Sequence, residues 1–329
     1  MIYPKFLRRG DTVGITAPSA PIGEKKRERF ALSLSHLQAE GYRIKETASV
    51  YGESYVSTDG ESRAKELDEL VRDPQTDMIF CASGGDFLID MLPYVDFAAI
   101  RQNPKWIQGY SDPTGLLFPV TTGLDAATVY GCNAGGFDME ELHPSLCNNL
   151  ALLRGEIREQ HSFARYEKEK GAGGAYNLTE PVFWKTPNGA VDVMGRLIGG
   201  CMECLCDLIG TPYDHAAEFA DRYEADGILW YFDIFALPAE NVHNALWHMK
   251  QAGWFKNACG FLFGRVLFAS SSLEMSYEEA ILRALGHDVP IVLDADIGHV
   301  APRMTVINGA VGRLRAKDGK GTLQTKLLP

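Results

Sequence analysis

Ser111 is the first residue in the sequence whose type and setting suit nucleophilic chemistry. It lies in the run Gly109-Tyr110-Ser111-Asp112, between a short apolar segment and a helix-like one. A serine at such a turn can point its hydroxyl into a cleft, where the free N–H groups of the following helix stabilise negative charge. The run matches half of the G-x-S-x-G nucleophile elbow, with Pro113 in place of the last glycine. The alternative is a helix N-cap serine, which these four residues alone favour.

The run Ser83-Gly84-Gly85 follows another apolar segment and is a candidate for an oxyanion-binding turn. Two adjacent glycines let the backbone approach a ligand closely and leave N–H donors exposed. An acyl-transfer site needs such donors where negative charge develops. The alternative for these residues is a plain tight turn.

His299 and Asp233 are the candidates for a general base and for the acid that orients it. His299 follows an apolar run and Gly298, which favours the rim of a cleft, although seven other histidines are present. Asp233 ends the apolar run GILWYF, where a carboxylate is costly unless it is paired or reaches water. It could fix the tautomer of a histidine, as the third member of a catalytic triad does. The alternatives are a structural histidine, and a helix cap or structural ion pair for Asp233.

The candidates Ser111, Asp233 and His299 occur in this order along the chain, and each follows a strand-like segment. Open α/β sheets bind ligands at the C-terminal ends of their strands, so we expect the three side chains to converge there. Together with the glycine-rich turn they predict a serine hydrolase that works through an acyl-enzyme.

A C-x-x-C pair at Cys201 and Cys204 is the one pattern that suggests a metal. A zinc site needs two further ligands at fixed spacing, and no second pair matches. We therefore expect these cysteines to pack in a core helix, and we expect neither a metal nor a cofactor.

The segments that must position these residues alternate between strand-like and helix-like patterns. Such alternation predicts an α/β fold, with an N-terminal flavodoxin- or Rossmann-like domain on a parallel sheet and a second, C-terminal α/β domain. We expect strands at 12–17, 42–46, 77–82, 106–109, 190–195, 227–232, 260–263, 291–293 and 304–307. We expect helices at 24–40, 62–72, 89–94, 114–123, 148–153, 201–210, 239–251 and 274–286.

The same patterns divide the chain into three parts. Residues 1–132 would form the domain that carries the nucleophile, and residues 189–329 the domain that carries Asp233 and His299. Between them, from 133 to 188, Gly, Asn, Pro and charged residues dominate. Segments of this kind are usually functional or disordered, so we expect an insertion that covers the cleft.

The composition limits the class of protein. Hydrophobic residues make up 46% and charged residues 23%, which suffices for a buried core. The net charge of -11 argues against nucleic acid as a partner. No apolar stretch approaches the ~18 residues that cross a bilayer, and the N-terminus lacks the apolar core of a signal peptide. Seven cysteines without a paired framework suit a reducing cytosol, so we expect a soluble, cytoplasmic protein with no membrane partner.

At this point the residues resemble the LD-carboxypeptidase family, which includes the branch of immunity peptidases that act on microcin C. The resemblance runs from the N-terminus nearly to the end of the chain. Its landmarks are Arg9-Gly10-Asp11 with TAPS at 16–19, Gly84-Gly85, GYSDPTGL at 109–116, GRLIGG at 195–200, LIGT at 208–211, the strand ending at Asp233, FGR at 263–265 and IGH at 297–299.

The resemblance implies a Ser-Glu-His triad at the interface of two α/β domains, without a metal and commonly in a homodimer. The serine matches Ser111 and the histidine matches His299, and the oxyanion hole uses backbone N–H groups that match Gly85 and Asp112. The typical substrate is a peptidoglycan tetrapeptide stem, cut between the L-centre of a diamino acid and terminal D-alanine. The immunity branch instead cleaves an amide in peptidyl- or aminoacyl-nucleotide antibiotics.

The sequence departs from the family pattern at the triad acid, because Asp233 is the acid nearest to the place of the family's glutamate. Its side chain is one methylene shorter, and a register shift of one residue would put Phe232 there instead. Glu203 is a poorer substitute. Replacement of the glutamate leaves open a third function, a catalytically weakened homologue that only binds its ligand.

The terminal carboxylate of such a substrate needs a cation. Arg303, four residues after the candidate base, and Arg265, at the end of a strand-like run, are the candidates. Trp184, in the predicted insertion, could belong to a lid or stack on a ligand ring, although simple packing is an equal alternative.

Overall fold

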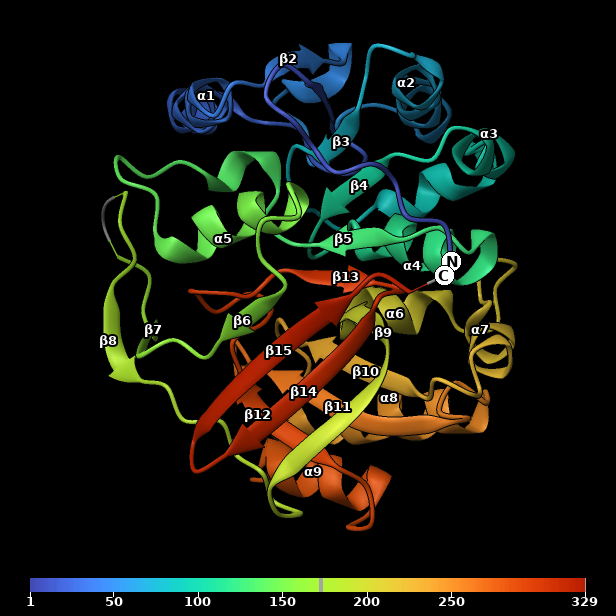
Figure 1. Ribbon diagram of the computed structural model, residues 1–329, viewed down its shortest axis with the longest axis vertical. Coiled ribbons are helices and arrows are strands. Elements are labelled where there is room, and N and C mark those ends of the chain that lie inside the picture. Colours follow the sequence, from blue (N-terminus) through green and yellow to red (C-terminus); the bar gives the residue numbers. More distant parts are fainter. Residues whose placement is uncertain (172–173, 329) are drawn as a thin grey trace.

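Two β-sheets, drawn one above the other in Figure 1, form the framework of the molecule. The computed structural model describes residues 1–171 and 174–328. The first sheet has the strand order β13-β5-β4-β3-β1-β2, and the second has the order β12-β11-β10-β9-β14-β15-β6. The α/β fold predicted from the sequence is thereby confirmed.

The first sheet is parallel except at one edge, where β13 runs antiparallel to β5. Every residue of β1, β3 and β4 is buried, as expected for parallel strands with helices on both faces. The strands span Thr12–Thr16 (β1), Arg43–Glu46 (β2), Met78–Cys81 (β3), Trp106–Gly109 (β4), Thr128–Tyr130 (β5) and Val306–Asn308 (β13). The accompanying helices and turns span Glu24–Ala39 (α1), Ala48–Val50 (η1), Gly60–Arg72 (α2), Leu88–Tyr94 (η2), Phe97–Gln102 (α3) and Ala134–Gly136 (η3).

The helix α4 (Thr114–Leu124) lies between the two sheets. It is buried from Thr114 to Thr122, which suits a helix without a polar face. Its Phe118 stacks on Trp254 of the second half, with ring centroids 4.9 Å apart. Because α4 follows Ser111 closely, this burial places Ser111 where the two halves meet.

The second sheet is parallel from β9 to β12 and antiparallel beyond β9. Its strands span Val191–Cys201 (β9), Ile228–Asp233 (β10), Ala258–Gly264 (β11), Ile291–Ala295 (β12), Val311–Lys317 (β14), Lys320–Lys326 (β15) and Glu159–His161 (β6). The helices of this half span Met202–Leu208 (α6), Ala216–Arg222 (α7), Ala239–Gln251 (α8) and Tyr277–Leu285 (α9). The C-terminal ends of β10 and β12 deliver Asp233 and the loop that carries His299.

The hairpin β14–β15 and the short strand β5 are absent from the sequence-based prediction. The hairpin turns at Asp318 and Gly319, which have φ values of 51° and 79°. Both positive values are typical of a type I′ turn, for which Asp-Gly is a preferred pair. The Asp-Gly pair in the sequence could therefore have predicted the hairpin. β5 has only three residues and lies between two glycine-containing segments, so its sequence has no clear strand pattern.

The proposed division of the chain does not coincide with sheet membership. β13, from the predicted C-terminal domain, extends the first sheet, and β6, from the predicted insertion, extends the second. The insertion also holds α5 (Pro144–Leu153) and the two-stranded sheet of β7 (Arg165–Glu167) and β8 (Leu178–Pro181), while its residues 172–173 lie outside the described residues. Strands pair where a sheet edge is free, irrespective of distance along the chain.

The helices within 1–171 and 174–328 include none that is long and apolar enough to cross a membrane.

Candidate active site

Ser111 occupies a strained turn between β4 and α4. Its φ is 68°, an unusual value for a residue with a side chain, and its N–H donates to the Tyr130 hydroxyl at 3.2 Å. Gly84 faces it closely, since a Cβ at Gly84 would lie 3.1 Å from the Cβ of Ser111. A serine held on a strained strand-to-helix turn is the geometry of a nucleophile elbow.

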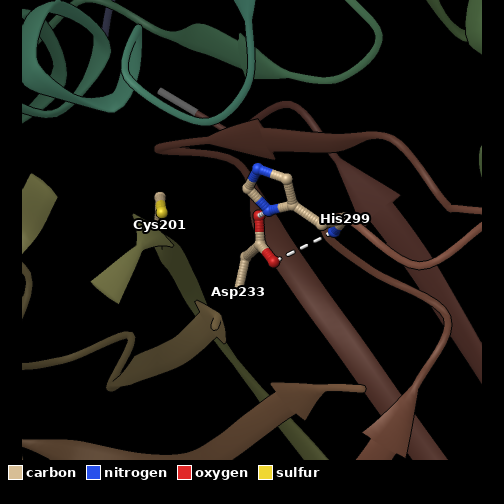
Figure 2. A group of neighbouring side chains, drawn as sticks. All are labelled: Cys201, Asp233 and His299. Carbon is tan, nitrogen blue, oxygen red and sulfur yellow. Dashed lines mark hydrogen bonds and ion pairs between the residues drawn. The ribbon is translucent and has the colours of Figure 1, made fainter. Parts of the chain in front are cut away.

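Asp233 and His299 form a buried pair at the ends of β10 and the β12 loop. Nδ1 of His299 lies 2.7 Å from Oδ2 of Asp233, and the carboxylate is fully buried. The other oxygen, Oδ1, accepts the backbone N–H of His299 at 3.0 Å, which is the dashed bond in Figure 2. A carboxylate held at Nδ1 in this way fixes the ring orientation and leaves Nε2 for proton transfer.

Tyr130 completes the surroundings of the carboxylate. Its hydroxyl donates to Oδ2 of Asp233 at 2.5 Å. Burial raises the pKa of Asp233, but the charge of His299 and the hydrogen bonds from His299 and Tyr130 outweigh burial and hold this pKa below its usual value. Burial and the Asp233 charge raise the pKa of Tyr130 well above its usual value, so the phenol stays protonated as a donor.

Gly298 makes the close approach of Asp233 possible. A Cβ at this position would lie 2.0 Å from Oδ1 of Asp233, and φ is +86°. Only glycine adopts this conformation without cost and leaves room for the carboxylate. The glycine in the IGH segment thus leaves the space that the carboxylate of Asp233 occupies.

The two other candidates for the triad acid have different surroundings. Phe232 is buried and stacks on Phe263, with centroids 5.2 Å apart. Glu203 accepts the backbone N–H groups of Phe235, Ala236 and Leu237 at 3.1, 2.8 and 2.9 Å, so it holds the loop after β10. Of the three residues considered for the place of the triad acid, Asp233 is the one that contacts His299.

Gly85 and Asp112 lie in two turns, after β3 and after β4, that are both closely packed. A Cβ at Gly85 would lie 2.2 Å from Oγ of Ser19, so this position requires glycine. The Asp112 carboxylate accepts the Ser19 hydroxyl and the N–H of Leu88, the latter at 2.9 Å, while burial raises its pKa. Within the described residues neither the N–H of Gly85 nor that of Asp112 has a hydrogen-bond partner.

Ser111 and His299 are neighbours without a direct hydrogen bond among the described residues. The ring of Tyr110 lies 5.1 Å from the imidazole, measured between centroids, and Ser111 comes next in the chain. The polar connection between them runs through Tyr130 and Asp233. Catalytic hydrogen bonds are often long in structures without substrate and shorten when it binds.

The three predicted substrate-binding residues fall into two places. Arg303 donates to the carbonyl of His299 at 3.2 Å and lies over the ring of Tyr110, 4.7 Å from its centroid. Arg265 is buried in an ion pair with Asp296, and the Trp184 indole donates to the same carboxylate at 3.0 Å.

Arg303 therefore lies beside His299, whereas Arg265 is already paired with the carboxylate of Asp296. Trp184 is only 1% exposed, which leaves no ring face open to a ligand. The interpretation of Trp184 as a lid or stacking residue is wrong for this conformation, because the indole is packed into the protein interior.

A cavity of about 430 Å³ opens beside the imidazole. Its wall includes Ser83, Gly84, Tyr110, Asn133, His299 and Arg303. It therefore adjoins both the glycine turn and the candidate base, and it is large enough for several residues of a peptide.

Cys201, Asp233 and His299, which are drawn in Figure 2, each offer one possible metal ligand atom. These three atoms lie within 4.8 Å of one another. The carboxylate and the imidazole Nδ1 already form an ion-pair contact of 2.7 Å. A hydrogen bond with Cys204 and then burial raise the pKa of Cys201 well above its usual value, so the thiol stays protonated. Cys201 ends β9 and caps α6, and Cys204 lies within α6, where the sequence predicted a packed helix.

Sequence reasoning missed Tyr130 and Asn133. The amide oxygen of Asn133 accepts the N–H of Tyr110 at 3.0 Å and so fixes the residue before Ser111. Tyr130 ends a strand of the same sheet, and the rule that strand ends carry functional residues would have singled it out had β5 been recognised.

Comparison with known families gives two matches that follow each other along the chain. The profile described as LD-carboxypeptidase N-terminal domain matches residues 13–131. The profile described as LD-carboxypeptidase C-terminal domain matches residues 194–314.

Relatives of similar length come from several bacteria. A Vibrio cholerae protein named provisionally as a carboxypeptidase is 28% identical over 95% of both chains. The "Probable murein peptide carboxypeptidase" of Bacillus subtilis is 26% identical over 98% of this chain and 94% of its own. The microcin C7 self-immunity protein MccF of Escherichia coli is 25% identical over 91% of this chain and 89% of its own.

Solved structures share the fold. An MccF-like protein from Bacillus anthracis superposes with a TM-score of 0.85 at 21% identity, over 99% of this chain and 100% of that chain. MccF in complex with aspartyl sulfamoyl adenosine gives 0.82 at 21% identity over both complete chains. A muramoyltetrapeptide carboxypeptidase from Oxalobacter formigenes gives 0.76 at 19% identity, over 97% and 99% of the two chains.

Proposed function

Because this chain belongs to the LD-carboxypeptidase family, we propose that it is a serine-type carboxypeptidase with Ser111 as its nucleophile. Its substrate is a peptidoglycan-derived LD-peptide, cut at the amide between the L-centre of a diamino acid and the terminal D-alanine. The observation that carries the proposal is the buried contact of 2.7 Å between Asp233 and His299 beside the strained turn of Ser111.

The first half of the reaction forms an acyl-enzyme. His299 removes the proton of the Ser111 hydroxyl as the oxygen attacks the scissile carbonyl, and Asp233 stabilises the resulting imidazolium. The backbone N–H groups of Gly85 and Asp112 hold the oxyanion. The imidazolium then gives its proton to the amine of the leaving D-alanine.

The second half of the reaction releases the shortened peptide. Water takes the place of the amine, His299 removes its proton, and the hydroxide attacks the ester at Ser111. The proton returns to the serine oxygen when the ester breaks. Asp233 stays ionised throughout, because its pKa lies below the usual value.

Arg303 binds the terminal carboxylate of the peptide. Its guanidinium lies against the His299 carbonyl and lines the cavity, while Arg265 is paired with Asp296. We expect Arg303→Ala to raise KM about tenfold or more for the free acid and to leave KM unchanged for the corresponding amide, as removal of a charge-assisted hydrogen bond predicts. Equal effects on both peptides would exclude this role.

The direct test is the release of D-alanine from the disaccharide-free tetrapeptide. Ser111→Ala should lower kcat by about 10⁴-fold or more with the fold intact by circular dichroism. Ser35→Ala, an exposed serine on α1, is the matched control and should keep the wild-type rate. A serine-reactive phosphonate should add its mass to the peptide that contains Ser111; hydrolysis by Ser111→Ala at the wild-type rate would refute the assignment.

Two other functions have definite signatures in the same experiment. An immunity-type peptidase would instead cleave a peptidyl-adenylate analogue offered beside the tetrapeptide. A binding protein without catalysis would take up one of the two ligands and release no product. The intact contacts of Asp233 favour an active enzyme over this last alternative.

We extend the proposal to the setting of the enzyme: a homodimer, as the family resemblance implies, in the cytoplasm, which suits seven cysteines without a paired framework. Sedimentation of the purified protein tests the dimer, and fractionation of the cells tests the location.

A further inference from the structure

The cavity beside His299 carries an excess of positive charge in an acidic protein. The whole chain has a net charge of -11. The cavity wall, however, includes five cationic side chains and two anionic ones, namely Lys26, Arg29, Lys168, Lys170 and Arg303 against Asp138 and Glu167.

Both anions in this wall are already engaged. Asp138 pairs with Arg29 at 2.7 Å. Oε1 of Glu167 accepts the backbone N–H groups of Gly171 and Asn177 at 3.0 and 2.8 Å. Asp138 therefore neutralises Arg29. Glu167 keeps its negative charge while it holds a loop, so a single carboxylate of the wall stands against the four other cations.

The remaining cations form no ion pair among the described residues. They are Arg303 at the imidazole end and the lysine rim, which we define as Lys26, Lys168 and Lys170. Nε of Arg303 is buried without a hydrogen-bond partner. Like charges gathered around one hollow repel each other, and a bound anion removes this cost.

We propose that the cavity selects a substrate with two anionic groups, one bound by Arg303 and the second by the lysine rim. The proposal rests on the function proposed above and names its substrate class more closely. In an LD-peptide the second group is a carboxylate, that of the γ-linked D-glutamate; in a peptidyl nucleotide it would be a phosphate.

Binding to Ser111→Ala protein tests this without turnover. Calorimetry compares the tetrapeptide with a free D-glutamate carboxylate, the same peptide with this carboxylate amidated, and adenosine monophosphate. We expect the free acid to bind about tenfold more tightly than the amide. In the combined variant Lys26→Gln, Lys168→Gln and Lys170→Gln this difference should vanish, whereas Lys25→Gln, an exposed neighbour outside the cavity wall, should leave it unchanged.

The outcomes separate this inference from the proposed function. If the three lysines matter only for adenosine monophosphate, the second anion is a phosphate and the peptide is not the substrate. If no ligand loses affinity in the combined variant, the inference is wrong, even where wild-type protein cleaves the tetrapeptide. Failure of cleavage by wild type contradicts the proposed function but leaves the affinity comparison readable.

A second inference comes from the chain of hydrogen bonds through Tyr130. This hydroxyl accepts the N–H of Ser111 at 3.2 Å and donates to Asp233 at 2.5 Å. One fully buried group thus connects the backbone of the nucleophile, on the first sheet's side, to the triad acid on the second. We infer that Tyr130 is a positioning residue that holds Ser111 in its strained turn and the aspartate in line with His299.

Tyr130→Phe tests the role, with Tyr231→Phe as the matched control. Tyr231 is equally buried, its ring centroid lies 5.6 Å from that of Tyr130, and its hydroxyl donates to Asn308 at 2.7 Å. Both variants lose one buried hydroxyl and should lose similar stability. Only Tyr130→Phe should lower kcat, by about 10- to 100-fold, with little change in KM.

The pH profile distinguishes positioning from a structural role. A carboxylate with one donor fewer holds the imidazolium more strongly, so the acid limb of kcat/KM should move to higher pH in Tyr130→Phe and stay in place in Tyr231→Phe. The other charged or titratable groups around the pair are Cys201, Glu203 and Tyr231 near Asp233, and Tyr110 and Arg303 at His299. Both variants keep all of them except Tyr231, whose hydroxyl the control removes. Equal kinetic effects of the two variants, or an unmoved limb, would overturn this inference.

Discussion

At the scale of single residues, Asp233 stands where the family resemblance implies a glutamate, and it is the proposed triad acid. Asp233 reaches His299 with both carboxylate oxygens, one on the ring and one on the backbone. This is possible because Gly298 has no side chain and so lets the loop come down onto the carboxylate. The missing methylene is thus accommodated by the loop.

Substitutions of Asp233 should reveal how closely the loop fits the shorter side chain. Asp233→Asn should lower kcat by about 10³- to 10⁴-fold, because the amide cannot stabilise the imidazolium and favours the wrong tautomer. Asp233→Glu, although it introduces the family residue, should also lower activity, because the extra methylene has no room between Tyr130 and Gly298. Steady-state rates on the tetrapeptide measure both; wild-type activity in Asp233→Glu would show that the loop adapts freely.

The ionisation of Asp233 also predicts a pH dependence of stability. Its pKa is lower in the folded protein than the ordinary value of 3.8, so the unfolded chain binds the proton first on acidification. The contribution of this carboxylate is therefore complete at pH values above the unfolded pKa and is lost as pH falls through the folded one. The free energy of unfolding from urea titrations should converge between wild type and Asp233→Asn as pH falls below about 4; a constant difference would contradict the linkage.

At the scale of elements, α4 connects the fold to the site. It begins just after the nucleophile turn and is packed between the sheets, where Phe118 contacts Trp230 and Trp254 with centroids 6.2 and 4.9 Å apart. A helix fixed on all sides holds its N-terminus in place, so the position of Ser111 depends on packing of both halves.

Phe118→Ala tests this dependence. Loss of a buried aromatic ring should lower the free energy of unfolding by about 3–5 kcal/mol, as measured by urea denaturation. Activity should also fall under conditions where the variant is still folded, because the space left by the removed ring lets α4 shift. Phe97→Ala, in a half-buried ring pair with Tyr213 at 6.0 Å, is a control at which stability should fall less and activity should persist.

At the scale of the whole molecule, the two sheets share strands from distant parts of the chain. β13 lies only a few residues before β14 of the second sheet, yet it pairs with β5 of the first. The termini also meet, because the Tyr3 hydroxyl donates to the carbonyl of Leu328 at 2.7 Å. These connections join the halves covalently and by hydrogen bonds.

We therefore expect the protein to unfold as one unit. Scanning calorimetry should give a single transition whose calorimetric and van't Hoff enthalpies agree. A fragment of residues 1–132 should fail to fold alone, because it lacks β13 and exposes the apolar surface of α4. Two separate transitions would show that each half is stable without the other.

The sequence by itself determined the fold class, most elements and the identity of the candidate triad. The apolar run that ends at Asp233 has the pattern of a buried strand, and the order of the candidates after successive strand-like segments favoured Ser111 more than its four local residues did. The family resemblance added the oxyanion donors. The hairpin at Asp318-Gly319 was within reach of the same reasoning.

Only the tertiary structure decided which residues touch. In the structure Asp233, and neither Phe232 nor Glu203, contacts His299. Arg265 forms an ion pair with Asp296, and the buried Trp184 donates to the same carboxylate. Tyr130 lies between Ser111 and Asp233. Burial and partners depend on how strands and helices from distant parts of the chain pack together, and local patterns carry little of that information. The β13–β5 pairing is an example, because a three-residue strand is specified by the sheet edge that it meets and not by its own sequence.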